Sequence, residues 1–430
     1  MKIIHRANTC FSIFFGDKHL LTDPWLDGPA VAQGWTPFPP AKSKIKDIPK
    51  PDLVYISHIH DDHCEAKTID GIDKETPIIC MNLGPNFLNK MLLKQGFRNI
   101  NLLNEKEPIK LEGFPEMFVE VFSSSRGHLT SNILDSGVIF KIGKKVIVNF
   151  NDNHPTKDQC NYIKENYRSI DLAFIPCGGG SGYPAMYENL DLKEKQEIVS
   201  ETMLKFDQMF SHAVDLLEPN IAVPVAGGFA IRGKHPIEVN RLQIRHIDEN
   251  KTINFHKKNG SYKNSKLIAM QPGMELDLNN EKIIKGKYKV WTEKEQDKFF
   301  EKISKEKINT RIKSKGKIPG LFNLIKVARN NMWEGQNRNN MIFDYNLYIE
   351  NSTSKEIFEI PTNKNEVNEV DKLNKQKPFL KLKLDQDTLL EWLLGYEDFN
   401  MLDSGHRISF LRKPNDYKVE AYFILSLFRL

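Results

Sequence analysis

The sequence predicts an α/β layered fold whose functional site lies on the loops at one edge of a sheet. Short apolar runs of β-favouring residues alternate with helix-like segments up to about residue 285. Several of these runs end in clusters of histidine and acidic residues. Because loops at strand ends carry function in layered folds, we expect the clusters to meet at one site.

Length and composition describe a globular chain. The 430 residues suffice for two domains, or for one large domain with an appended unit. The formal net charge of +5 is mild and does not call for a nucleic-acid partner. Five scattered cysteines favour a reducing, cytoplasmic setting over a disulfide framework. The sequence shows neither a signal-peptide pattern nor an apolar run of membrane-spanning length.

The predicted elements follow in order from the N-terminus. Two strand-like runs flank the turn at residues 16–18, and a loop rich in Gly, Pro and Trp follows at residues 27–40. Apolar periodicity then indicates a buried strand at 53–56, a strand at 76–82, a helix at 86–97, a strand at 117–125, a hairpin at 137–150, a strand at 171–177, an amphipathic helix at 193–217 and a strand at 221–228.

The composition changes near Lys285. Residues 286–340 are predicted to form a Lys-rich helical connector with its charged face in water, the alternative being a patch for an anionic partner. Residues 341–430 are predicted to form a small C-terminal α+β domain. Within this domain we expect a polar loop over 351–376 and, from Gln386 onward, a helix, a turn and a final apolar helix.

A dense group of possible metal ligands follows the strand at 53–56. His58, His60, Asp62 and His63 lie within six residues. Residues two apart in an extended segment point the same way, so His58 and His60 can converge on one point and a turn can direct Asp62 and His63 to a second. The alternative is a loop in which these polar side chains only hydrogen-bond within the protein, but imidazoles and carboxylates pack poorly and bind divalent metals well. The pattern predicts a two-metal site.

Later strand ends offer further ligands. His128 follows the strand that ends near Ser123, and His235 follows the strand at 221–228. Asp152 ends the hairpin, where its two oxygens could bridge two ions, and His154 could compete with it.

The intact pattern H-x-H-x-D-H at residues 58–63 resembles the metallo-β-lactamase superfamily. The segments "TDPWLDGPAVAQGW", "LVYISHIHDDH", "CGGGSGYP" and "AGGFAIRGKHP" look most like the catalytic part of the CMP-N-acetylneuraminate hydroxylase family. The resemblance implies an αββα sandwich over residues 1–285, with Asp62 and Asp152 as the catalytic carboxylates. It also implies one metal held by His58, His60 and His128, a second held by Asp62, His63 and His235, and a bridge from Asp152.

Two reactions are compatible with this resemblance. The hydroxylase family carries a Rieske iron–sulfur domain, whose C-x-H and C-x-x-H ligand pairs are not found among these 430 residues. This difference, and the hydrolytic chemistry that prevails in the superfamily, favour hydrolysis, whereas the similarity to the hydroxylase family favours a diiron, O2-dependent oxygenase that receives electrons from a separate partner protein. We favour the oxygenase. The alternative is a Zn- or Mn-dependent hydrolase of the phosphodiesterase or lactonase type, because these ligands suit all three metals. A binding module without catalysis is a third reading, against which the complete ligand set argues.

The expected substrate is a small anionic molecule, linked to a nucleotide or to a carrier. The glycine-rich segment Gly178, Gly179, Gly180 and Ser181 could bring backbone N–H groups close to an anion, or could serve only as a tight turn. Arg232 and Lys234 are further candidates. Asp23 resembles a superfamily position that holds the second nitrogen of a metal-binding histidine. Trp25 and Trp35 are expected to pack.

Overall fold

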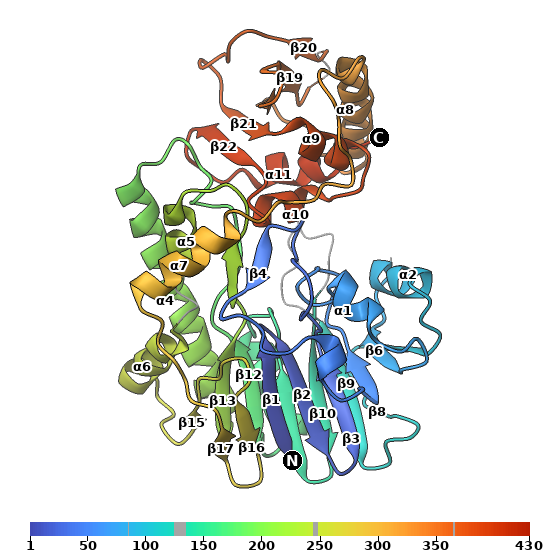
Figure 1. Ribbon diagram of the computed structural model, residues 1–430, viewed down its shortest axis with the longest axis vertical. Helices are drawn as coiled ribbons and strands as arrows, with labels where there is room; N and C mark the ends of the chain where they lie inside the picture. Colours follow the sequence, from blue (N-terminus) through green and yellow to red (C-terminus); the bar gives the residue numbers. More distant parts are fainter. Residues whose placement is uncertain (85, 124–134, 244–247, 364–365) are drawn as a thin grey trace.

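The computed structural model describes residues 1–84, 86–123, 135–243, 248–363 and 366–430. Two lobes lie one above the other (Figure 1): a sandwich of two sheets built from residues up to about 285, and a C-terminal lobe above it. The predicted residue His128 lies outside the described residues. Among the described residues, no helix combines the length and the apolar character needed to cross a bilayer.

Two mixed sheets form the sandwich. The first has the order β17-β16-β1-β2-β3-β5-β6-β7 and the second β15-β13-β12-β11-β10-β9-β8, while β4 and β14 form a separate ribbon. The strand bounds are β1 Lys2–Ala7, β2 Cys10–Phe15, β3 Lys18–Thr22, β4 Trp35–Pro37, β5 Leu53–Tyr55, β6 Ile78–Met81, β7 Ile100–Leu103, β8 Ile109–Lys110, β9 Met117–Ser123, β10 Ser136–Ile142, β11 Lys145–Asn149, β12 Leu172–Pro176, β13 Ile221–Val225, β14 Phe229–Ile231, β15 Lys266–Leu267, β16 Glu275–Asp277 and β17 Lys282–Lys285.

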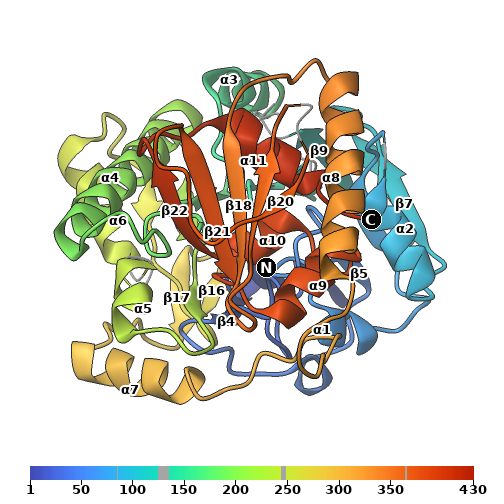
Figure 2. The ribbon, with the colours of Figure 1, turned by 90° about the horizontal axis from the view of Figure 1, so that it is seen from above.

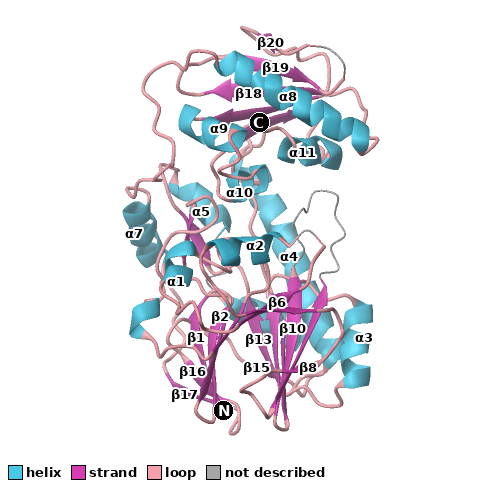
Figure 3. Cartoon of the chain, turned by 90° about the vertical axis from the view of Figure 1, so that its right-hand side faces the viewer, coloured by secondary structure: helices cyan, strands magenta, loops and turns pink. Residues whose placement is uncertain are grey.

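Alternating side chains make three apolar layers from these sheets. In β5 and the residue that follows it, the side chains alternate between two layers. Leu53 and Tyr55 enter the core between the two sheets, whereas Val54 and Ile56 pack beneath the helices that cover the first sheet. This is the period-two alternation of a strand buried on both faces. The helices α3 and α4 cover the outer face of the second sheet. The predicted αββα sandwich is therefore confirmed (Figure 3).

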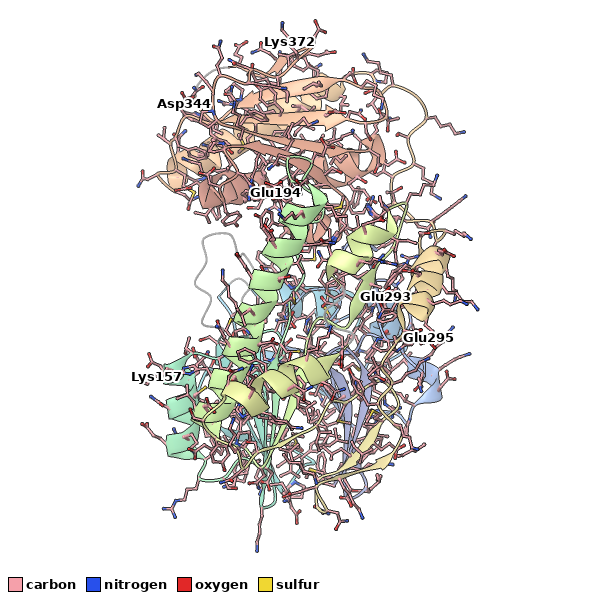
Figure 4. All side chains as sticks on the ribbon, turned by 90° about the vertical axis from the view of Figure 1, so that its left-hand side faces the viewer. Lys157, Glu194, Glu293, Glu295, Asp344 and Lys372 are labelled. Carbon is pink, nitrogen blue, oxygen red and sulfur yellow. The ribbon has the colours of Figure 1, made fainter. Side chains whose placement is uncertain are left out.

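Several of the helices that flank the sandwich begin at side-chain caps. The bounds are η1 Ile45–Asp47, α1 Ala66–Asp70, α2 Phe87–Lys94, α3 Lys157–Asn166, α4 Leu192–Leu217, α5 Ile237–Gln243, α6 Glu249–Asn259 and α7 Glu293–Ile303. The predicted amphipathic helix is α4, which Asp191 and Glu194 cap reciprocally. Figure 4 labels Glu194 at the end of α4 that lies beside the C-terminal lobe.

The C-terminal lobe is a five-stranded sheet with helices. Its order is β20-β19-β18-β21-β22, and Figure 2 shows this sheet and α8 above the sandwich. The bounds are α8 Leu321–Arg338, β18 Asn346–Asn351, β19 Ile357–Pro361, β20 Asn368–Glu369, β21 Phe379–Leu384, α9 Gln386–Leu393, α10 Phe399–Ser404, β22 Ser409–Lys413 and α11 Val419–Ser426.

The structure differs from the sequence prediction in three parts of this lobe. Helix α8 falls within the predicted connector but packs on the C-terminal sheet through Leu321, Ile325 and Met332. Strands β19 and β20 lie in the expected polar loop, and β22 lies where only helices and a turn were expected. β19 pairs with β18, β20 pairs with β19, and β22 pairs with β21. Local pattern does not reveal such pairing between segments.

A shared apolar core joins the two lobes. Trp35 of the sandwich stacks on Phe229, with ring centroids 3.6 Å apart, and its indole nitrogen donates a hydrogen bond to the Ser404 carbonyl at 2.7 Å. Gly34 and Gly405 meet backbone to backbone at this junction. The predicted packing role of Trp35 is confirmed, and Trp25 is fully buried as well.

Replacing Gly405 with alanine is expected to destabilise the junction by about 1–3 kcal/mol. A Cβ atom there would overlap the carbonyl oxygens of Val31 and Met401, and backbone atoms cannot rotate away. Urea unfolding of the variant measures the loss. Gly84→Ala is the control because a Cβ at Gly84 meets nothing within 4 Å; equal midpoints for the two variants would contradict this account.

Candidate metal centre

The end of β5 brings two histidine nitrogens together. His58 Nε2 and His60 Nδ1 lie 2.7 Å apart, in the loop that directly follows the strand. Burial lowers the pKa of His58 well below its usual value, and the neighbouring histidines add to this effect. His58 is therefore a neutral imidazole with a lone pair available for a cation. The predicted convergence of His58 and His60 is confirmed.

A second group forms around His63. Its Nε2 lies 3.2 Å from Asp152 Oδ2 and 3.4 Å from Asp62 Oδ2. Burial lowers the pKa of His63, but the neighbouring carboxylates, Asp152 foremost, outweigh this and hold the pKa well above its usual value. A positive charge is thus favoured at this point. The ligand atoms of His58, His63 and Asp152 all lie within 4.8 Å of one another, an arrangement that fits a divalent cation.

Asp23 orients His63 directly and His58 through Ser57. Its Oδ2 lies 2.8 Å from His63 Nδ1 and accepts a hydrogen bond from Ser57 Oγ at 2.9 Å. The same Ser57 hydroxyl lies 2.9 Å from His58 Nδ1. These contacts place the ring protons on the Nδ1 atoms and leave the Nε2 atoms free for a metal. The predicted contact of Asp23 with the second nitrogen of a histidine is present, while the contacts of Ser57 were not predicted.

Asp23→Asn is expected to weaken metal binding about 10- to 100-fold while the fold is kept. An amide can accept from Ser57, but it no longer supplies the negative charge that supports His63. Metal titration with a competing chelator measures the affinity. An unchanged affinity would show that Asp23 serves packing alone.

Backbone strain accompanies the site. Asn8, Asp23, Asn151 and Ala226 have positive φ angles of 45°, 38°, 54° and 64°. Asn8 donates to Asp62 Oδ2 at 3.3 Å, and its carbonyl oxygen Oδ1 accepts from the N–H groups of residues 227 and 228. Left-handed conformations are costly outside glycine and gather at functional sites. The loop around Ala226 is thereby held against Asp62.

One carboxylate near the first group was not predicted. Asp135 Oδ1 lies 3.4 Å from His58 Nε2, and the ligand atoms of Asp135, His58 and His60 lie within 4.8 Å of one another. Asp135 directly precedes β10. Its position as the last residue before a buried strand is a signal that sequence reasoning could have used.

The other predicted ligands lie elsewhere. His154 stacks on Phe206 of α4, with centroids 5.0 Å apart. His235 is in neither ligand group formed by described residues; its ring lies 6.5 Å from that of His406 in the C-terminal lobe. His235 and Lys234 line a groove of about 520 Å³ together with Lys195.

The predicted anion-binding residues have structural partners. Arg232 is buried, pairs with Glu306 at 2.9 Å and donates to the Gln33 carbonyl. Within the segment Gly178–Ser181, a Cβ on Gly180 would overlap Trp35. Glycine is thus required there for the close approach of Trp35.

The C-terminal lobe borders the ligand-bearing loop. Burial, followed by the charge of Asp61, raises the pKa of Glu397 to about 7. The Ala32 N–H helps to hold the Asp61 carboxylate, and the Ala32 carbonyl accepts from Arg407. The loop over residues 58–63 therefore lies at the junction of the two lobes.

The two-sheet sandwich and its histidine–carboxylate groups define a metallo-β-lactamase-fold, metal-dependent enzyme. The chain belongs to the beta-lactamase superfamily domain family, whose model matches residues 2–226. That range includes every residue of the two ligand groups.

Similar sequences include hydroxylases. The chain is 27% identical to the cytidine monophosphate-N-acetylneuraminic acid hydroxylase of Mus musculus over 300 residues, covering 65% of this chain and 47% of that protein. It is also 27% identical to the Danio rerio hydroxylase over 256 residues, covering 58% and 40%. The chain spans about half the length of the curated relatives it matches.

Solved structures with a similar sandwich include two kinds of enzyme. CmlA, a diiron β-hydroxylase from Streptomyces venezuelae, is 16% identical with a TM-score of 0.43, covering 64% of this chain and 53% of CmlA. Igni18, a metallo hydrolase from Ignicoccus hospitalis KIN4/I, is 20% identical with a TM-score of 0.43, covering 64% and 97%.

Proposed function

We propose that this protein is a dinuclear, O2-dependent hydroxylase that acts on a small anionic, nucleotide-linked substrate and takes electrons from a separate protein. The observation that carries the proposal is the mixed histidine–carboxylate site, in which His63 lies between Asp152 and Asp62. Mixed sites of this kind suit iron as well as zinc and manganese. Similarity to the nucleotide-sugar hydroxylases over 65% of the chain favours iron and hydroxylation.

In this proposal the two ions have separate ligand groups. His58 and His60 would hold one ion, which His128 would join by the family pattern. His63 and Asp62 would hold the other, with Asp152 available to both. The proposal leaves out His235, because its ring faces His406 in the C-terminal lobe.

The bound metals would supply the site for O2 reduction, and the protein would orient the histidine ligands and exclude water. The substrate C–H becomes C–OH with one oxygen atom of O2, while the other leaves as water after two electrons and two protons arrive. Asp23 keeps His63 in a single tautomer. Side chains of His58 and His63 are fully shielded from solvent, which limits the entry of water.

The direct test is isotope incorporation. Iron-loaded protein is incubated with a reductase system, 18O2 and CMP-linked or other nucleotide-linked acidic sugars, with an anaerobic sample as control. We expect one 18O atom in the product and no product without O2. Hydrolysis of phosphodiesters or lactones by zinc- or manganese-loaded protein, without any O2-dependent product, would establish the hydrolase alternative instead.

A further inference from the structure

We propose that Asp135 is a metal ligand that joins His58 and His60 at one position of the centre. This assignment rests on the dinuclear site proposed above and extends its ligand set. It adds a ligand that neither the sequence prediction nor the family pattern used for the other ligands contains.

The geometry places Asp135 directly on the first ligand group. Its Oδ1 lies 3.4 Å from His58 Nε2, which itself lies 2.7 Å from His60 Nδ1. The Asp135 side chain is only 14% exposed. The ligand atoms of Asp135, His58 and His60 all lie within 4.8 Å of one another, an arrangement that fits a shared divalent cation.

The backbone next to Asp135 is fixed by a buried hydrogen-bond network. The Ser136 carbonyl accepts from Tyr55 Oη and from Asn151 Nδ2, both at 2.9 Å. The Ser136 hydroxyl donates to the Ser57 carbonyl, also at 2.9 Å. Tyr55 and Ser57 precede His58, and Asn151 precedes Asp152. The residue next to Asp135 is thus hydrogen-bonded to both ligand-bearing segments, and these hydrogen bonds hold Asp135 beside His58.

Charge supports the same assignment. Two divalent ions bring four positive charges, and the carboxylates of Asp62, Asp152 and Asp23 supply three negative ones. Asp135 supplies a further negative charge beside these carboxylates. A set of two histidines and one carboxylate with open positions is the arrangement that non-haem iron(II) oxygenases use. Zinc hydrolases use two histidines and one carboxylate as well, so Asp135 adds a ligand that suits either metal.

The test measures metal binding rather than turnover. Wild type, Asp135→Asn, Asp135→Glu and Asp171→Asn are loaded anaerobically with Fe(II), and in parallel with Co(II) as a spectroscopic probe. Bound metal per chain, dissociation constants and the Co(II) absorption spectrum are recorded. Asp171→Asn is the matched control, since Asp171 is also a buried carboxylate at a strand start but pairs with Lys145. Thermal unfolding verifies that each variant is folded.

We expect wild type and Asp171→Asn to bind two ions. Asp135→Asn should bind one ion more weakly, by on the order of 100-fold or more. This loss is larger than the one typical of a residue that only hydrogen-bonds to a metal ligand. The Co(II) absorption spectrum of this variant should also change. Asp135→Glu should recover part of the affinity.

The assignment would be overturned if Asp135→Asn bound two ions with the affinity and the Co(II) spectrum of the wild type. A wild-type chain that binds two ions but hydroxylates nothing would reject the proposed reaction and leave Asp135 in place, whereas a wild-type chain without metal would reject both.

Discussion

His58→Ala is expected to lower bound metal and reduce turnover by about 100-fold or more. His58 is the residue that both ligand groups share, with His60 and Asp135 in one group and His63 and Asp152 in the other. Losing a direct ligand should weaken metal binding by more than the roughly 10- to 100-fold effect of losing a residue that only hydrogen-bonds to a ligand. Elemental analysis after anaerobic loading gives the bound metal, and the isotope assay gives turnover.

A matched histidine variant isolates this effect. His212 is exposed on α4, outside both ligand groups. His212→Ala should keep wild-type metal content and turnover. If His58→Ala also retained two ions, the two groups could not be the metal centre.

Metal removal is expected to destabilise the folded protein strongly. Each ion that binds only the folded chain contributes about 4 kcal/mol of stability at a free concentration 1,000-fold above its dissociation constant. Without metal, several carboxylates remain close together around His63. Thermal unfolding with and without a chelator should show a marked drop in Tm, which added Fe(II) reverses.

The same experiment on His58→Ala provides the control. Its Tm should respond far less to the chelator, because the site no longer binds metal fully. An identical response of both proteins would mean that the chelator acts elsewhere.

Local pattern was sufficient to predict the sandwich and the first ligands. Leu53–Ile56 alternate between two apolar layers, and the H-x-H-x-D-H spacing places its side chains directly after that strand. Both features depend on residues that are neighbours in the sequence. The prediction of His58, His60 and His63 as one cluster therefore needed no knowledge of distant contacts.

The remaining features depend on contacts between distant segments. Asp135 reaches His58 only because Ser136 is bound to Ser57, which lies 79 residues away in the chain. Asn8 meets Asp62 through the pairing of β1 with β2 and of β3 with β5. Arg232 resembled an anion-binding residue in the sequence, but Glu306 of a distant segment pairs with it. No spacing rule reveals such contacts.

The central claim is that the centre holds iron and reacts with O2. The most direct measurement is the metal content of protein purified without air, combined with its absorption spectrum before and after O2 is admitted. The account predicts two irons per chain and a spectral change on oxidation that Asp135→Asn diminishes. Two zinc ions per chain, a spectrum that O2 leaves unchanged, and full retention of both ions in Asp135→Asn would contradict it.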